Sequence, residues 1–138
     1  GRQMLAAMIL GAEGVQVGSR FVVTPEASSH QAFKKAVIDA KEGDTQLTLK
    51  ELAPVRLIKN DFYQIVQEAY KNGATIEELK SLLGRGRAKK GMFEGDVNAG
   101  ELEIGQVSAL IDQMKPAAAI VTELMNDYTK AKERLFSV

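Results

Sequence analysis

The first apolar residues of the chain recur at the spacing of an α-helix. In the opening stretch GRQMLAAMIL, positions 4, 5, 8 and 9 are apolar, which places them on one face of a helix. Gly11 follows, and glycine commonly ends a helix because it adopts the left-handed conformation at little steric cost. The pattern predicts an amphipathic helix that ends near Gly11, and we expect the chain to begin within a larger fold.

The next apolar pattern, GVQVG at residues 14–18, alternates instead. Val15 and Val17 have small neighbours and suit a short strand that is buried on both faces. Such strands need parallel neighbours, which other β–α units supply. No second strand of that kind follows in the sequence. The pattern therefore predicts the tail of an α/β unit that ends at Gly18.

The rest of the chain is predicted to be mostly helical. Two helix starts carry capping signals: Asn60 precedes a helix that runs to about Lys71, and Thr75 forms a capping box with Glu78. Pro116 begins the last helix. Further predictions are a helix over 31–41, a short strand over 45–49, an extended or loop segment at PVRLIKN, loops between residues 91 and 105, and a helix near residue 105.

Composition narrows the class of protein. The chain has 138 residues, 45% hydrophobic and 26% charged, which suits roughly one globular domain. Its 18 basic and 18 acidic residues balance, so no strong overall field attracts nucleic acid or an anionic membrane. No apolar run approaches the ~20 residues that span a bilayer. The absence of cysteine excludes disulfides and thiolate metal sites and fits the cytoplasm, where we place the protein.

The turn at Gly18 has a possible chemical role. A strand that ends at Gly18 and Ser19, followed at once by a helix start, directs consecutive backbone N–H groups toward one point, where an anion fits. In eight-stranded β/α barrels, a cofactor phosphate commonly binds beside the last two strands, against such a short helix. Gly18 would let the phosphate approach, and the Ser19 hydroxyl would donate a further bond. A tight strand-to-helix turn that binds nothing explains the same residues equally well.

Two motifs resemble one enzyme family. GAEGVQVGSRF and, further on, GDVNAGELEIGQVSALI look like the C-terminal part of the flavin-dependent family that contains enoyl-acyl-carrier-protein reductase II and nitronate monooxygenase. The resemblance implies an α/β fold: the last helix–strand–helix unit of a (β/α)8 TIM barrel over residues 1–43, then a mostly helical extension over 44–138 that folds back on the barrel.

The resemblance also implies a cofactor and its contacts. The Gly-Ser pair at Gly18 and Ser19, with Arg20 next to it, would hold the FMN phosphate, although serine stands where threonine is commoner. Gly105 and Gln106 resemble the family's C-terminal glycine-glutamine, which lies close to the flavin. The family's Gly-rich flavin loop and catalytic histidine belong upstream of Gly1. We therefore assign no catalytic residue to this chain and expect it to be inactive by itself.

The activity that follows from the resemblance is a hypothesis with alternatives. We favour an enoyl-acyl-carrier-protein reductase of fatty acid synthesis, in which NADH or NADPH reduces FMN and the flavin passes hydride to the thioester. A nitronate monooxygenase, which oxidises a small nitronate with dioxygen, is the close alternative. Acyl carrier protein or a small nitronate would be the partner, and a homodimer is expected. From another class, a helical interaction module that binds no cofactor stays open.

Other residues have simpler interpretations. His30, the single histidine, precedes a helix in a polar segment, where a solvated or capping role is expected. The basic stretch Arg85–Lys90 could steer an acidic partner, but such runs are usually solvated. Four acidic residues near the glycine-rich segment match no calcium loop, and solvent exposure is expected for Glu94, Asp96, Glu101 and Glu103. Met92 is the one methionine that could touch a ligand.

Overall fold

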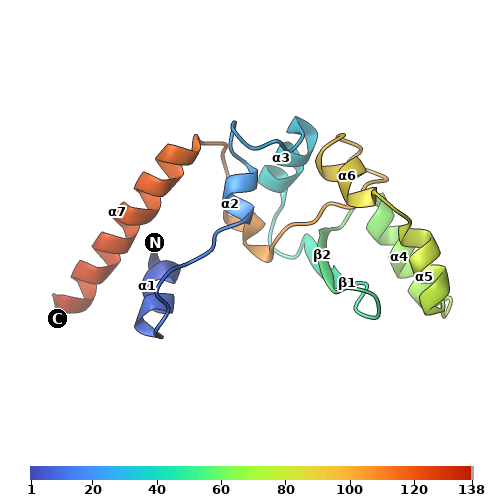
Figure 1. Cartoon of the computed structure of the whole chain (residues 1–138), viewed down its shortest axis with the longest axis horizontal. Coiled ribbons are helices and arrows are strands. Elements are labelled where there is room, and N and C mark those ends of the chain that lie inside the picture. Colours follow the sequence, from blue (N-terminus) through green and yellow to red (C-terminus); the bar gives the residue numbers. More distant parts are fainter. Residues whose placement is uncertain (138) are drawn as a thin grey trace. The chain divides into compact units, whose positions relative to one another are not determined.

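The computed structural model describes residues 1–137, apart from the side chain of Phe136 (Figure 1). Its elements follow one another as α1 (Arg2–Ile9), α2 (Ser19–Val22), α3 (Gln31–Asp39), β1 (Thr45–Thr48), β2 (Val55–Ile58), α4 (Asp61–Lys71), α5 (Ile76–Leu83), α6 (Arg87–Met92), the 3-10 helix η1 (Gln106–Leu110) and α7 (Ala117–Phe136). They form two compact units. One comprises Gly1–Ala27 with Lys115–Val138, and the other comprises Ser28–Met114.

The first unit is built on the long helix α7. Helices α1 and α2 both contact α7. Among the described residues, the buried apolar side chains of this unit are Leu5 of α1, Val23 at the end of α2 and Ile120 of α7. Pro116, at the N-cap of α7, makes no side-chain capping bond. Instead the Glu26 carboxylate accepts the Ala117 N–H at 3.1 and 3.2 Å. A negative charge at this position also favours the positive end of the helix dipole.

The turn that ends α1 confirms one prediction. Gly11 has a φ of +98°, and the N–H groups of Gly11 and Ala12 donate to carbonyls of the last helical turn, on Met8 and Ala7. This is the bonding by which a left-handed residue closes a helix. The amphipathic helix predicted for the first residues is present, with Leu5 as its buried member.

The strand predicted at residues 14–18 is wrong. The structure assigns no strand there, and Val15 and Val17 are 42% and 37% exposed. A strand exists only where a neighbour completes its hydrogen-bond ladder. The one sheet among the described residues consists of β1 and β2, and neither pairs with this segment. The helix start expected directly after Gly18 is present as α2.

The second unit packs helices around a small antiparallel sheet. β1 pairs with β2, Thr45 lying opposite Ile58 and Thr48 opposite Val55. On the other edge of β2, Leu57 forms a bridge with Glu103. The core beneath the sheet consists of Leu49, Leu57, Phe62, Val66 and Leu79. The strand predicted over 45–49 is confirmed as β1, and the segment predicted as extended or loop contains β2.

The helix caps of this unit were predictable. Asn60 Oδ1 accepts the Tyr63 N–H at 3.0 Å and begins α4. Thr75 and Glu78 form the reciprocal capping box of α5. Helix α3 ends at Asp39, close to the expected bound. The helix expected near residue 105 is the 3-10 helix η1, and the short helix α6 was not predicted. The expected boundary between a barrel unit over residues 1–43 and a helical extension over residues 44–138 stays a prediction.

Candidate functional site

Gly18 is the N-cap of α2, and its surroundings do not require a glycine. Its φ of −97° and ψ of −74° are accessible to any residue. A Cβ built on Gly18 would meet no heavy atom within 4 Å. Neither backbone conformation nor packing among the described residues therefore explains the glycine. A group that approaches the backbone closely does explain it, so the position fits a cofactor phosphate.

The first turn of α2 closes on Gly18. The N–H groups of Phe21 and Val22 donate to the Gly18 carbonyl at 2.9 and 3.3 Å. Ser19 and Arg20 are the first two helical residues and are half-buried. The backbone N–H groups of such a turn point together toward the N-terminal side of the helix. Residues 18–20 thus begin a helix, as the phosphate hypothesis requires, but no strand leads into it, and the phosphate contact stays a prediction.

The second predicted contact lies at the start of η1. Gly105 is the N-cap, its carbonyl accepts the Ser108 N–H at 3.0 Å, and the Gln106 side chain is exposed. η1 packs against α3. Ser108 is fully buried, and among the described residues its hydroxyl oxygen has no hydrogen-bond partner. Gly105 and Gln106 belong to the second unit and Gly18 to the first, so each part of the site is described by itself.

The segment that precedes Gly105 and Gln106 is hydrogen-bonded to β2. The Ile58 N–H donates to the Leu102 carbonyl at 3.0 Å, and the Ile104 N–H donates to the Arg56 carbonyl at 3.1 Å. Leu102 and Ile104 are buried. Residues 102–104 are therefore held along the other edge of β2 by two backbone bonds, and Gln106 follows two residues after the last of them.

Asn60 does more than the capping role that the sequence predicts. While its Oδ1 caps α4, its Nδ2 donates to the carbonyls of Val97 and Gly100, both at 2.8 Å. The Phe62 N–H donates to the Asn98 carbonyl at 3.1 Å. The start of α4 thus holds the turn 95–100. Asparagine is the common N-cap residue that also carries two amide donors, and this is the signal that could have revealed the second role.

The interpretation of Arg85–Lys90 as a solvated basic run is wrong for Arg87. Its guanidinium donates to the carbonyls of Leu82, Leu83 and Ala99 at 2.8–2.9 Å. It also lies over the Phe62 ring, 4.4 Å from the centroid. Arg87 therefore joins the end of α5 to the turn 95–100. We call Asn60 and Arg87 together the turn clamp.

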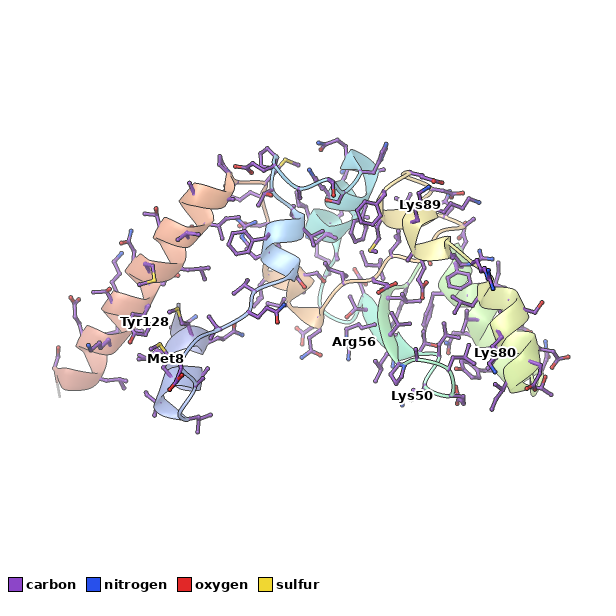
Figure 2. All side chains as sticks on the ribbon, in the orientation of Figure 1. Met8, Lys50, Arg56, Lys80, Lys89 and Tyr128 are labelled. Carbon is purple, nitrogen blue, oxygen red and sulfur yellow. The ribbon has the colours of Figure 1, made fainter. Side chains whose placement is uncertain are left out.

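The other basic residues of this run pair at the surface. Lys89 lies 3.1 Å from a carboxylate oxygen of Glu94, and Lys90 lies 2.9 Å from one of Asp96. In Figure 2 the Lys89 side chain is drawn on α6, and it is exposed. The bond from the Ala99 N–H, followed by the one from Lys90, lowers the pKa of Asp96.

Among the described residues, no group of three or more histidine or acidic side chains is placed to hold a metal ion.

Glu101 is buried rather than exposed as expected. It is 7% exposed, and burial, with a smaller contribution from the nearby Glu103 carboxylate, raises its pKa to about 7. Arg87 opposes this shift only in part. Its guanidinium bonds go to backbone carbonyls instead of to this carboxyl group. Glu101 is thus a carboxyl group that is partly protonated near neutral pH, four residues before Gly105.

His30 has the capping role that the sequence predicts. Its Nδ1 accepts the Ala32 N–H at 3.1 Å and begins α3. The backbone N–H of His30 donates to the Met92 carbonyl at 2.8 Å. The ring packs against Gly95, where a Cβ would collide with it. Met92 therefore takes part through its backbone, and its side chain is half-buried.

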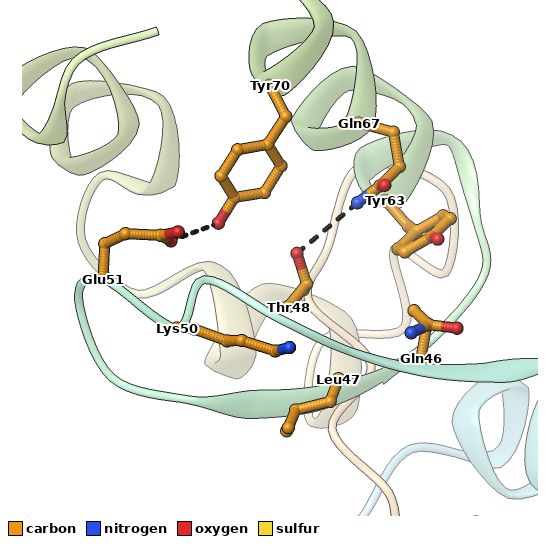
Figure 3. Close-up of a pocket in the computed structure, with 8 residues that line it drawn as sticks. All are labelled: Gln46, Leu47, Thr48, Lys50, Glu51, Tyr63, Gln67 and Tyr70. Carbon is orange, nitrogen blue, oxygen red and sulfur yellow. Dashed lines mark hydrogen bonds between the residues drawn. The ribbon is translucent and has the colours of Figure 1, made fainter. Parts of the chain in front are cut away.

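A polar pocket of about 250 Å³ lies between β1, the loop after it and α4. Figure 3 shows the two hydrogen bonds that line it, from Tyr70 to Glu51 and from the Gln67 amide to the Thr48 hydroxyl. The first measures 2.7 Å and the second 3.5 Å between donor and acceptor. The bond from Tyr70 lowers the pKa of Glu51, while burial, followed by this bond, raises the pKa of Tyr70. The pocket contains none of the residues that the sequence predicts as cofactor contacts.

Within residues 1–137, no helix is both long and apolar enough to cross a membrane.

Comparison with known proteins identifies the family. A family model described as nitronate monooxygenase matches residues 1–127. A probable nitronate monooxygenase of Staphylococcus saprophyticus is 32% identical over 133 residues, which cover 91% of this chain and 37% of that protein. A second relative with the same description, from Staphylococcus haemolyticus, is 41% identical over 69 residues, 49% of this chain and 19% of that protein.

Solved structures agree with this assignment. FabK from Thermotoga maritima matches 99% of the chain with a TM-score of 0.85 and 32% identity, over 43% of its own length. Nitroalkane oxidase from Streptomyces ansochromogenes matches 97% of the chain with a TM-score of 0.71 and 25% identity, over 38% of its length. The chain thus shares the fold of a part of these enzymes and spans less than half of each. It belongs to the nitronate monooxygenase family, which confirms the resemblance drawn from the two motifs.

Proposed function

We propose that this chain is the phosphate-binding and C-terminal part of an FMN-dependent enoyl-acyl-carrier-protein reductase that uses NADH or NADPH. The likeness to FabK supports this choice, because its TM-score of 0.85 and 32% identity exceed the 0.71 and 25% of nitroalkane oxidase. We take FabK to represent the reductase branch of the family. The partial TM barrel at the start of the chain is part of the same proposal.

In this proposal the chain's own residues bind and orient the cofactor. FMN, when bound, supplies the transfer of hydride between a nicotinamide and the substrate. Gly18, Ser19 and Arg20 would hold its phosphate through backbone N–H groups and the serine hydroxyl. Gly105 and Gln106 would lie near the flavin. The open face of Gly18, which neither conformation nor packing explains, supports the phosphate contact.

A nitronate monooxygenase is the second candidate. The description of the family model and the names of the curated relatives favour it. It would use the same cofactor contacts, with a small nitronate and dioxygen in place of the thioester and the nicotinamide. Acyl carrier protein is the proposed partner for the reductase, and a homodimer is proposed for either enzyme.

The test uses the whole protein that contains this chain. Its visible absorption is recorded after purification, and turnover is then measured separately with an enoyl thioester plus NADH or NADPH and with a nitronate plus dioxygen. Bound flavin and thioester reduction are the expected result. Bound flavin with nitronate oxidation alone would establish the second candidate. A protein that neither retains nor binds added FMN would contradict both and favour a non-catalytic interaction module.

A further inference from the structure

The turn 95–100 is held by residues that lie far away in the sequence. Asn60 donates from the start of α4 to the carbonyls of Val97 and Gly100. Arg87 donates to the Ala99 carbonyl at 2.8 Å. Inside the turn, the Asp96 carboxylate accepts the Ala99 N–H and the Asp96 carbonyl accepts the Gly100 N–H, both at 2.9 Å. The carbonyls of Val97, Ala99 and Gly100 thus each accept a bond from a side chain outside the turn.

The chain after the turn is fixed in register as far as Ile104. The Glu101 N–H donates to the Arg87 carbonyl at 3.1 Å, and residues 102–104 pair with β2. Between the turn and Gly105, Glu101, Leu102 and Ile104 therefore each have a backbone bond to α6 or β2. Asn60 comes two residues after Ile58, so the bonds from Asn60 to Gly100 and from Ile58 to Leu102 hold the N-terminal end of this segment together. Loss of the Asn60 bonds would weaken the series of contacts whose last bond, at Ile104, lies two residues before Gln106.

We propose that the turn clamp, Asn60 and Arg87, positions Gln106 for its contact with the flavin. This inference rests on the proposed function, in which Gln106 lies near FMN. The clamp residues touch backbone carbonyls, so they act through the segment 101–105 and are positioning residues. Asn60 is the sharper test of the two, because its capping oxygen and its clamping nitrogen can be separated by one substitution.

Asn60→Asp is that substitution. The aspartate oxygen still accepts the Tyr63 N–H, and aspartate is as good an N-cap as asparagine. It has no donor for the carbonyls of Val97 and Gly100, and its charge repels them. We expect α4 to remain folded, as circular dichroism will show, and FMN in the whole protein to bind about threefold to tenfold more weakly.

Thr75→Ala is the matched control. It removes the capping bond at the start of α5, whereas Arg87 bonds to the carbonyls of Leu82 and Leu83 at the other end of that helix. It should lower the melting temperature to a similar degree while leaving the FMN dissociation constant unchanged. Asn60→Ser, which keeps a capping oxygen but cannot reach the turn, serves as a second variant if the aspartate protein is poorly folded. Equal weakening of FMN binding by Thr75→Ala would overturn the inference.

A double-mutant cycle with Gln106→Leu gives the decisive readout. If Asn60 acts through Gln106, Asn60→Asp should change FMN affinity by less than about twofold once Gln106 is already leucine. Additive effects of the two substitutions would overturn the clamp as a positioning device. If Gln106→Leu weakens binding and Asn60→Asp does not, the inference fails and the proposed function stands. If Gln106→Leu itself has no effect, the proposed flavin contact fails, and the inference fails with it.

Discussion

Gly91 of α6 and Gly100 lie in direct backbone contact. A Cβ built on Gly100 would overlap the backbone of Gly91, and one built on Gly91 would lie 2.6 Å from the Glu101 carbonyl oxygen. Both residues are buried, and neither has a positive φ. They are therefore glycine because of packing. Because neither residue has a side chain, the backbone of α6 approaches the backbone of residues 100 and 101, which precede Gln106 in the chain.

Gly100→Ala should consequently destabilise the protein by about 2–3 kcal/mol, since backbone atoms must move to admit one methyl group. Gly14→Ala is the control, because a Cβ there meets nothing within 4 Å and φ is not positive. Its effect should stay within about 0.5 kcal/mol. Urea unfolding of both variants measures the difference, and equal midpoints would show that the contact between Gly91 and Gly100 does not constrain the fold.

Glu101 should make the protein less stable as the pH rises. Its folded pKa of about 7 lies above the ordinary 4.5, so between these two values the folded state binds more protons than the unfolded state. The contribution of Glu101 to the free energy of unfolding then falls as the pH increases from about 4.5 to 7, and levels off above. Glu101→Gln should remove this dependence and stabilise the protein at pH 8 by on the order of 2 kcal/mol.

Glu103→Gln provides the matched comparison for this pH effect. The Glu103 carboxylate is the second cause of the raised pKa of Glu101. Without that charge, the pKa of Glu101 should decrease and the pH range over which stability falls should move lower. Urea unfolding at pH 4.5, 6 and 8 distinguishes the variants. A stability profile of the Glu101→Gln protein that parallels the wild type would assign the dependence to other groups.

Local signals in the sequence were enough for most helix boundaries. Asn60, Thr75 and Gly11 each satisfy backbone groups within a few residues of themselves, so their roles can be inferred from neighbouring letters alone. The same holds for His30 at the start of α3. Capping is a local interaction, and that is why these predictions are confirmed.

The failures concern interactions between distant residues. A strand at residues 14–18 requires a hydrogen-bonded neighbour, and alternation of Val15 and Val17 cannot supply one. Arg87 sits in a charged run, yet it is used internally because carbonyls from α5 and from the turn 95–100 converge on it. Glu101 is likewise buried, and its backbone is held against α6 by the bond from its N–H to the Arg87 carbonyl. None of these contacts has a signature within a short window of sequence.

Ser19→Ala tests the side-chain part of the proposed phosphate site. The backbone N–H groups of residues 18–20 would provide most of the binding, and the hydroxyl would add one bond. We expect FMN affinity in the whole protein to fall by on the order of 1 kcal/mol, about fivefold. Titration of apoprotein with FMN, followed by flavin fluorescence, measures it. A loss of a hundredfold or more would mean that the serine, not the backbone, dominates binding.

Gly18→Val tests whether a phosphate occupies the open face of Gly18. Within the described residues a side chain there has free space and an allowed backbone conformation, so folding should be little affected. If the phosphate of FMN lies against this backbone, a branched side chain would take its place, and affinity should fall far more than for Ser19→Ala.

Gly14→Val is the matched control for Gly18→Val, because Gly14 also has free space around a built Cβ and lies in the same segment between α1 and α2. It should retain FMN at close to the wild-type dissociation constant. The ranking of the three variants is the result that matters: Gly18→Val weakest, Ser19→Ala intermediate and Gly14→Val unchanged. Wild-type affinity in the Gly18→Val protein would place the phosphate elsewhere, and residues 18–20 would then be a turn that binds nothing.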